Sequence, residues 1–271
     1  MDPTPDIAVL LQHGYEYLAA AGIVFSRMTA VMLVMPVFTR IGVTGVLRNG
    51  IALALALPMV PAAAAALAGE HLGTARIAAL LFKEFTVGLV LGFVLGVPLW
   101  AAEAAGDMLD LQRGASMATL IDPQGTEEAS VTGTILSLAM VALFFASGGF
   151  LITVRMLYES YGIWPVARIL PVFAPDAATQ LLGLLDDVFN LGLLLVVPII
   201  ICLLLADILL ALVSRAAPHF NVFALSLAVK SLLFAVLLVL YSGFLASYMG
   251  RDLATLAGAT DRLHAISGGG K

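Results

Sequence analysis

The sequence predicts an all-α membrane protein with about six hydrophobic helices. Of its 271 residues, 61% are hydrophobic and 11% are charged, and the mean hydropathy is +1.05. Soluble domains are about 45–50% apolar and about 25% charged, so a soluble fold could not bury this much apolar surface. The apolar residues also fall in runs close to the ~20 residues that a helix needs to cross the hydrocarbon core. Helices are favoured because a single open segment must satisfy its own backbone hydrogen bonds in lipid.

Six apolar segments meet this length criterion, and several of them are interrupted by prolines or charges. Proline removes a helix hydrogen bond, and a charge at mid-bilayer costs several kcal/mol. Such helices are better accommodated against other protein than against lipid, so the pattern favours a subunit of a larger helical assembly. The segments are 18–38, 51–68, 77–102, 131–154, 188–213 and 222–248, and the interruptions include Pro58, Pro61, Lys83, Glu84, Pro98, Pro198, Asp207 and Lys230.

The chain divides into a helical domain over residues 1–250 and a tail over residues 251–271, which ends in Ser-Gly-Gly-Gly-Lys and is expected to be flexible. Two polar connections, 103–130 and 155–187, separate the later segments. The Lys and Arg residues give no clear bias between the two sides, so the orientation stays open.

Four charges are predicted to be buried: Arg27, Asp207, Arg215 and Lys230. An ionisable residue within a membrane segment is by default a functional-site hypothesis. The alternatives are a structural ion pair or a capped carbonyl, and Asp207 and Lys230 could pair across the last two segments. A proton or ion relay is the competing interpretation.

Small residues mark two further candidate sites. Gly88, Gly92 and Gly96 share one helix face, which permits close helix packing either with other subunits or within this chain. The stretch 112–123 is rich in small residues, and it is either an ordinary surface loop or a loop inserted into a pore. Non-helical backbone at membrane depth requires protein or a cavity around it. Its residues are Gln112, Arg113, Gly114, Ala115, Ser116, Met117, Ala118, Thr119, Leu120, Ile121, Asp122 and Pro123.

The residues give no support for catalysis, a metal, a cofactor or nucleic acid. The net charge is −5, without the clustered Lys and Arg that nucleic-acid binding requires. The four histidines are scattered and form no His-Glu-x-x-His pair, and no phosphate-binding Gly-Lys-Ser/Thr sequence occurs. We therefore expect a protein that is not an enzyme.

Segment 206–231 closely resembles the C-terminal signature of the FliR/SctT family, which comprises flagellar FliR and the injectisome proteins SctT, YscT, SpaR and HrcT. Ala211 stands where the family usually has glycine, and His219 where it has glutamine, so neither takes a family role. The matching residues are Asp207, Leu210, Arg215, Pro218, Asn221, Val222, Phe223 and Lys230.

Other blocks match the family in the same order over nearly the whole chain. One group of residues resembles the injectisome branch more than the flagellar one: Ser147-Gly148-Gly149-Phe150, Tyr158, Ser160-Tyr161 and Trp164-Pro165. The remaining matches are Arg27, Pro36, Arg48, Pro58, Glu84, Gly88, Gly92, Gly106, Asp110, Gln112, Gly114, Asp122 and Pro123.

The resemblance implies an inner-membrane subunit of a type III secretion export gate, within a secretion basal body. Such a subunit assembles with SctR (FliP-like) and SctS (FliQ-like) subunits and with an SctU/FlhB-like switch protein, among tilted helical hairpins. The gate conducts unfolded secreted proteins, and residues 112–123 correspond to the loop that plugs its closed pore. A small-solute or ion secondary transporter is the alternative, because broken helices occur there too.

Overall fold

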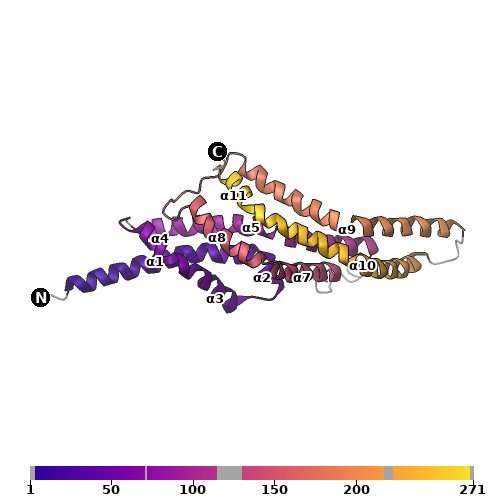
Figure 1. Ribbon diagram of the computed structural model, residues 1–271, viewed down its shortest axis with the longest axis horizontal. Coiled ribbons are helices and arrows are strands. Elements are labelled where there is room, and N and C mark those ends of the chain that lie inside the picture. The colour runs from indigo at the N-terminus through magenta and orange to yellow at the C-terminus, as the bar shows by residue number, and fades with distance from the viewer. Residues whose placement is uncertain (1–3, 71, 115–129, 217–221, 269–271) are drawn as a thin grey trace. The chain divides into compact units, whose positions relative to one another are not determined.

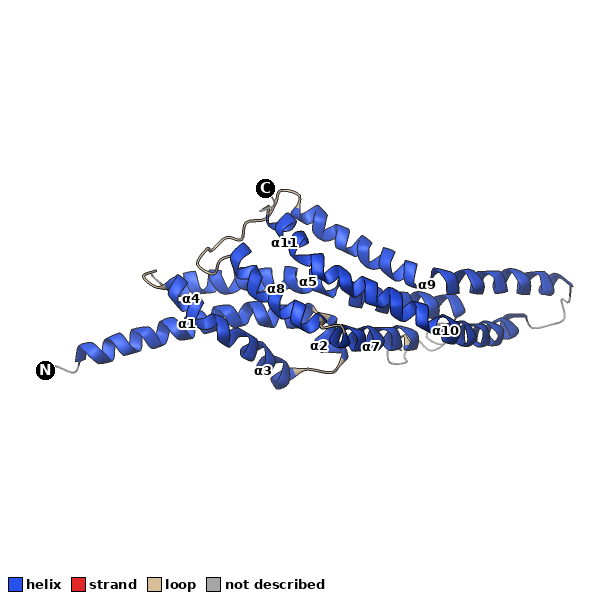
Figure 2. Cartoon of the chain, in the orientation of Figure 1, coloured by secondary structure: helices blue, strands red, loops and turns tan. Residues whose placement is uncertain are grey.

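The computed structural model describes residues 4–70, 72–114, 130–216 and 222–268, and every regular element in these ranges is helical (Figures 1 and 2). This confirms the predicted all-α class. The helices are α1 (Thr4–Val34), α2 (Pro36–Arg40), α3 (Gly45–Ala56), η1 (Leu57–Met59), α4 (Val60–Leu67), α5 (Thr74–Arg113), α7 (Val131–Ala146), α8 (Gly149–Ile163), α9 (Ala177–Ala216), α10 (Val222–Ala254), η2 (Thr255–Gly258) and α11 (Ala259–Ser267).

Within the described residues, five helices are long and apolar enough to cross a membrane, and the pair α7 and α8 can supply a sixth span. The five are Leu11–Val34, Gly45–Leu67, α5, α9 and Leu225–Ala254. This agrees with the predicted number of about six hydrophobic helices.

The expected interruptions occur at only some of the predicted places. Helices α5 and α9 are continuous through Pro98 and Pro198. A transmembrane helix tolerates proline where neighbouring groups or small local adjustments satisfy the freed carbonyl. Pro58 lies in the 3₁₀ turn between α3 and α4. The segment 131–154 is instead broken at Gly148, whose φ of 77° ends the α-helical path.

The polar connections are also shorter than expected. Helix α5 extends to Arg113, because Glu103, Asp107 and Asp110 recur at helical spacing and give it a polar face. Helix α8 likewise extends to Ile163, and α9 begins at Ala177. The three acids therefore lie on one face of α5, although the sequence placed them in the connection 103–130.

The chain forms two compact units, and the division into a helical domain and a tail stays a prediction. Unit 1 contains Met1–Gly96, Gly148–Gly183 and Leu256–Lys271, and unit 2 contains Val97–Ser147 and Leu184–Thr255. The described part of the predicted tail is helical and packed, with Leu263 1% exposed and Ile266 2% exposed. The Ala174 amide also donates to the Ile266 carbonyl at 2.8 Å. Apolar burial therefore overrides the flexibility expected from the glycine-rich end of the sequence.

Candidate functional site

A fully buried group of charges lies inside unit 1. The Arg27 guanidinium of α1 donates from Nε to Oε2 of Glu84 on α5 at 2.5 Å, and neither side chain is exposed. Lys83, the residue before Glu84, contacts the other carboxylate oxygen and is 3% exposed. Two cations therefore share one carboxylate away from solvent.

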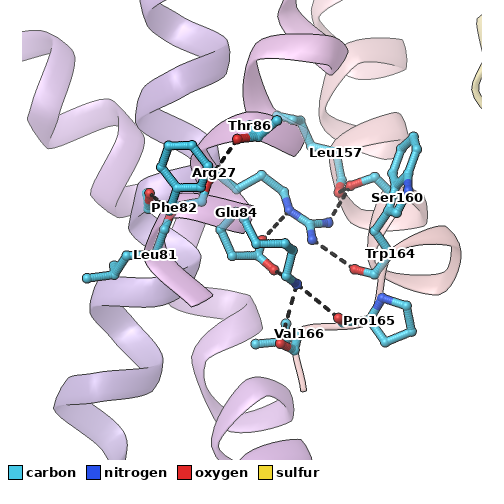
Figure 3. Close-up of polar contacts among 12 residues, drawn as sticks. Arg27, Leu81, Phe82, Glu84, Thr86, Leu157, Ser160, Trp164, Pro165 and Val166 are labelled. Carbon is cyan, nitrogen blue, oxygen red and sulfur yellow. Dashed lines mark hydrogen bonds and ion pairs between the residues drawn. The ribbon is translucent and has the colours of Figure 1, made fainter. Parts of the chain in front are cut away.

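The end of α8 supplies the remaining partners of these cations (Figure 3). Arg27 donates to the Ser160 hydroxyl and to the Trp164 carbonyl, each at 2.8 Å. Lys83 donates to the carbonyls of Pro165 at 3.0 Å and Val166 at 3.3 Å. Pro165 and Val166 directly follow the C-cap residue of α8, and their carbonyl oxygens accept from the second cation in place of water.

An aromatic ring completes the Arg27 site. The guanidinium carbon lies 3.8 Å from the centre of the Tyr161 ring, a cation–π geometry. Arg27 of α1 is thus held by a carboxylate from α5, by a hydroxyl and a ring from α8, and by the carbonyl of the C-cap residue of α8. This geometry favours the structural ion pair with capped carbonyls over an ion relay.

Gly88 and Gly92 bring the backbones of α1 and α5 close together. A Cβ atom at Gly88 would lie 2.7 Å from Ala30 Cβ, and one at Gly92 would lie 3.1 Å from the Val31 carbonyl oxygen. These two glycines therefore pack within the chain, which is one of the two alternatives that the sequence left open. Gly96 is also buried, and its role in subunit packing stays a prediction.

A second polar cluster, in unit 2, joins α9 and α10 to the end of α5. Lys230 Nζ lies 3.0 Å from Asp207 Oδ1 and donates to the Gln112 carbonyl at 2.9 Å. The Gln112 side-chain amide donates to Asp207 Oδ2 at 3.3 Å. The structure therefore brings Asp207 and Lys230 together, and it adds Gln112 to them. Their side chains are 37% and 12% exposed, so both are only partly buried.

The first residues of the predicted plug rest on one face of α10. The Arg113 guanidinium lies 4.9 Å from the centre of the Phe234 ring. Gly114 has a φ of 81°, which ends α5, and a Cβ atom there would lie 2.9 Å from Leu227. Together with Lys230, these contacts hold the end of α5 against α10. The other plug residues, Ala115, Ser116, Met117, Ala118, Thr119, Leu120, Ile121, Asp122 and Pro123, lie outside the described residues.

The remaining predicted charge differs from expectation. Arg215 is exposed at the end of α9, so it is not buried by this chain itself. Three residues that the sequence placed in no site do have structural roles: Lys83, Glu84 and Asp110, all on α5. The sequence feature that could have indicated these residues is a charge within or beside an apolar helix. Such a charge indicates that the side chain is buried, but it does not indicate which residue pairs with it. No group of three potential metal ligands occurs in the ranges that the structure describes.

Long apolar helices with internal ion pairs define a multi-pass membrane protein, and comparison with known proteins places it in a family. Residues 18–256 match the family described as bacterial export proteins, family 1, and the chain belongs to that family.

Individual relatives agree with this assignment. Yop proteins translocation protein T of Yersinia pestis is 36% identical over 228 residues, which cover 84% of this chain and 87% of the relative. Secretion system apparatus protein SsaT of Salmonella typhimurium is 33% identical over 238 residues, covering 87% and 90% of the two chains. Flagellar biosynthetic protein FliR of Caulobacter vibrioides is 26% identical over 203 residues, covering 75% and 80%. These findings confirm the FliR/SctT resemblance and its leaning toward the injectisome branch.

Proposed function

We propose that this protein is an inner-membrane core subunit of a type III secretion export gate and helps to form the pore for unfolded secreted proteins. Membership of the bacterial export family supports this function, as do the names of relatives that belong to translocation and secretion systems. It acts by holding a passage open or closed rather than by catalysis.

The observation that carries the proposal is the uneven burial of the apolar helices. The chain itself buries 72% of the most apolar window of α5. The corresponding share is only 28% in α9 and 6% in α10. Lipid can cover aliphatic side chains, but it cannot satisfy the Asp207 carboxylate, which is 37% exposed on α9. Other protein subunits satisfy both requirements, whereas the water of a pore satisfies the carboxylate alone.

The partners that fit this surface are the SctR/FliP-like and SctS/FliQ-like subunits and the SctU/FlhB-like switch protein. Expressed alone in detergent, the chain should be unstable, and co-expression with the first two partners should increase its yield and give a defined complex. The measurement is the mass and composition of the solubilised particle. A stable, monodisperse monomer that transports a small solute would instead establish the secondary transporter.

Residues 112–123 are proposed to plug the closed pore. Their described beginning supports this, because Gln112, Arg113 and Gly114 are held by α10 rather than left free in solvent. Close packing in a closed pore depends on van der Waals contact, which weakens steeply once gaps open. Deleting residues 115–118 should therefore make the resting gate leak ions without preventing its assembly.

A matched pair of substitutions tests the location of the plug. Ser116→Arg should cause a leak or block secretion, whereas Thr126→Arg, in the same connection but outside residues 112–123, should do neither. Membrane conductance is measured in cells that contain the assembled gate but do not secrete. If the deletion and Ser116→Arg both leave the membrane tight and secretion normal, residues 112–123 are not the plug.

A further inference from the structure

One buried carboxylate joins the end of α5 to the beginning of α7. Asp110 lies in the last turn of α5 and is 3% exposed. Its Oδ1 accepts from Arg113 Nη2 at 2.9 Å and from the Thr132 hydroxyl at 2.5 Å. Its Oδ2 accepts from the Ser130 hydroxyl at 2.7 Å and from the Thr132 amide at 3.0 Å. Donors from both sides of the connection 114–129 therefore converge on a single side chain.

Ser130 extends this contact into the first turn of α7. It is the N-cap residue, and its hydroxyl accepts from the Gly133 amide at 2.8 Å while donating to Asp110. The N-terminus of a helix also carries partial positive charge, which favours a carboxylate there. Asp110 thus caps α7 from another helix, directly through Thr132 and indirectly through Ser130.

A close backbone contact lies one turn away on α5 and supports the same arrangement. A Cβ atom at Gly106 would approach the backbone of Thr132 and Gly133, with the Thr132 carbonyl carbon only 2.6 Å away. Backbone atoms cannot move aside as a flexible side chain can, so the two helices meet here at a fixed point. The beginning of α7 cannot slide along α5 without breaking the bonds to Asp110.

We propose that Asp110 is the positioning residue that holds both ends of the connection 114–129 at one place. The chain leaves α5 and re-enters α7 beside this carboxylate, and its α5 end also contacts α10. Under the proposed function, on which this inference partly rests, Asp110 fixes the point from which residues 112–123 extend.

Asp110→Asn tests the proposal with little change in shape. The amide replaces one acceptor oxygen by an NH₂ group, which cannot accept from the donors around it, and it removes the charge. The matched control is Asp186→Asn, which changes an exposed carboxylate on α9, away from the contact between α5 and α7. Each hydrogen bond to a charged group strengthens an association by about tenfold to a hundredfold. In Asp110→Asn, the fraction of molecules in which the end of α5 has separated from the beginning of α7 should therefore rise by at least about tenfold.

The ends of the connection are followed by the distance between spin labels at the exposed residues Leu111 and Val131 in the assembled complex. Cys202 is first replaced by serine, since it is the only native cysteine. We expect a narrow distance distribution for the parent and for Asp186→Asn, and a broad or longer one for Asp110→Asn. A narrow distribution in Asp110→Asn overturns the proposal, whatever the conductance. If that variant does not assemble, Thr132→Val, which removes one donor and keeps the side-chain shape, decides in the same way.

Conductance per assembled complex separates this inference from the plug. Broadened distances together with increased ion leak support both proposals. Broadened distances with an intact barrier support the role of Asp110 and overturn the plug assignment of residues 112–123.

Discussion

Replacing Glu84 by glutamine should destabilise the protein far more than most single substitutions do. The side chain keeps its size, but Arg27 and Lys83 lose the carboxylate that they share. All three residues are at most 3% exposed, so water cannot take its place. Glu84→Gln therefore leaves two uncompensated cations inside unit 1.

The expected magnitude follows from the geometry. Removing one partner of a buried ion pair costs about 3–5 kcal/mol, because the remaining charge stays desolvated. The upper part of this range applies here, since Glu84 lies 2.5 Å from Arg27 and also contacts Lys83. Lys83→Met should cost less, because Arg27 and Glu84 then form a neutral pair and only the carbonyls of Pro165 and Val166 lose a donor. The double variant should cost less than the sum of the two single ones.

Thermal unfolding of the solubilised complex, followed by tryptophan fluorescence, measures these differences. Trp164 is a suitable probe, because it is 2% exposed and its carbonyl accepts from Arg27. The control is Glu159→Gln on α8, where Glu159 pairs with an Arg155 side chain that is 77% exposed. Exposed pairs contribute about 0–1 kcal/mol, so this control should change little. A loss below about 1 kcal/mol for Glu84→Gln, or strictly additive single and double variants, would refute the reasoning.

Three further predictions follow from packing and partial burial. Gly192→Ala should destabilise the protein by about 1–3 kcal/mol, because its Cβ atom would lie 2.8 Å from a backbone carbonyl oxygen of α5. The control is Gly183→Ala on the same helix, where the space around the glycine is open. That variant should be neutral or should stabilise the protein by up to about 1 kcal/mol. Equal unfolding temperatures for these two variants would contradict the packing. Asp207→Asn should lower the yield of the export complex. It should destabilise the chain less than Glu84→Gln does, since the Asp207 carboxylate is 37% exposed. A normal yield of the complex, with secretion losing only its dependence on the proton gradient, would favour a relay instead. Leu263→Ala should lower the stability of the protein by about 2–5 kcal/mol, and His264→Ala should change it very little, because only Leu263 is buried. The protease sensitivity of α11 measures this difference. Equal protease resistance of the two variants would show that α11 is a dispensable tail.

The fold class and the family could be predicted from local properties of the sequence. A membrane span requires a long apolar run, and such a run is visible without knowing its neighbours. The block around Asp207 and Lys230 indicated the family in the same way, because its residues are contiguous. The two charges are also close enough in sequence, on successive helices, for their pairing to be anticipated, and the structure places them 3.0 Å apart.

The partners of the other charges depend on contacts between distant parts of the chain. Arg27 meets Glu84 after 57 positions and Ser160 after 133, and no periodicity encodes which helices meet. The sequence placed Asp110 in the polar connection 103–130, and only the structure shows that the beginning of α7 lies beside it. The C-terminal residues looked flexible because glycine ends the sequence, yet Leu263 and Ile266 become buried once α11 packs in unit 1. A buried charge or apolar side chain reveals that it needs a partner, but only the packing of helices in space selects that partner.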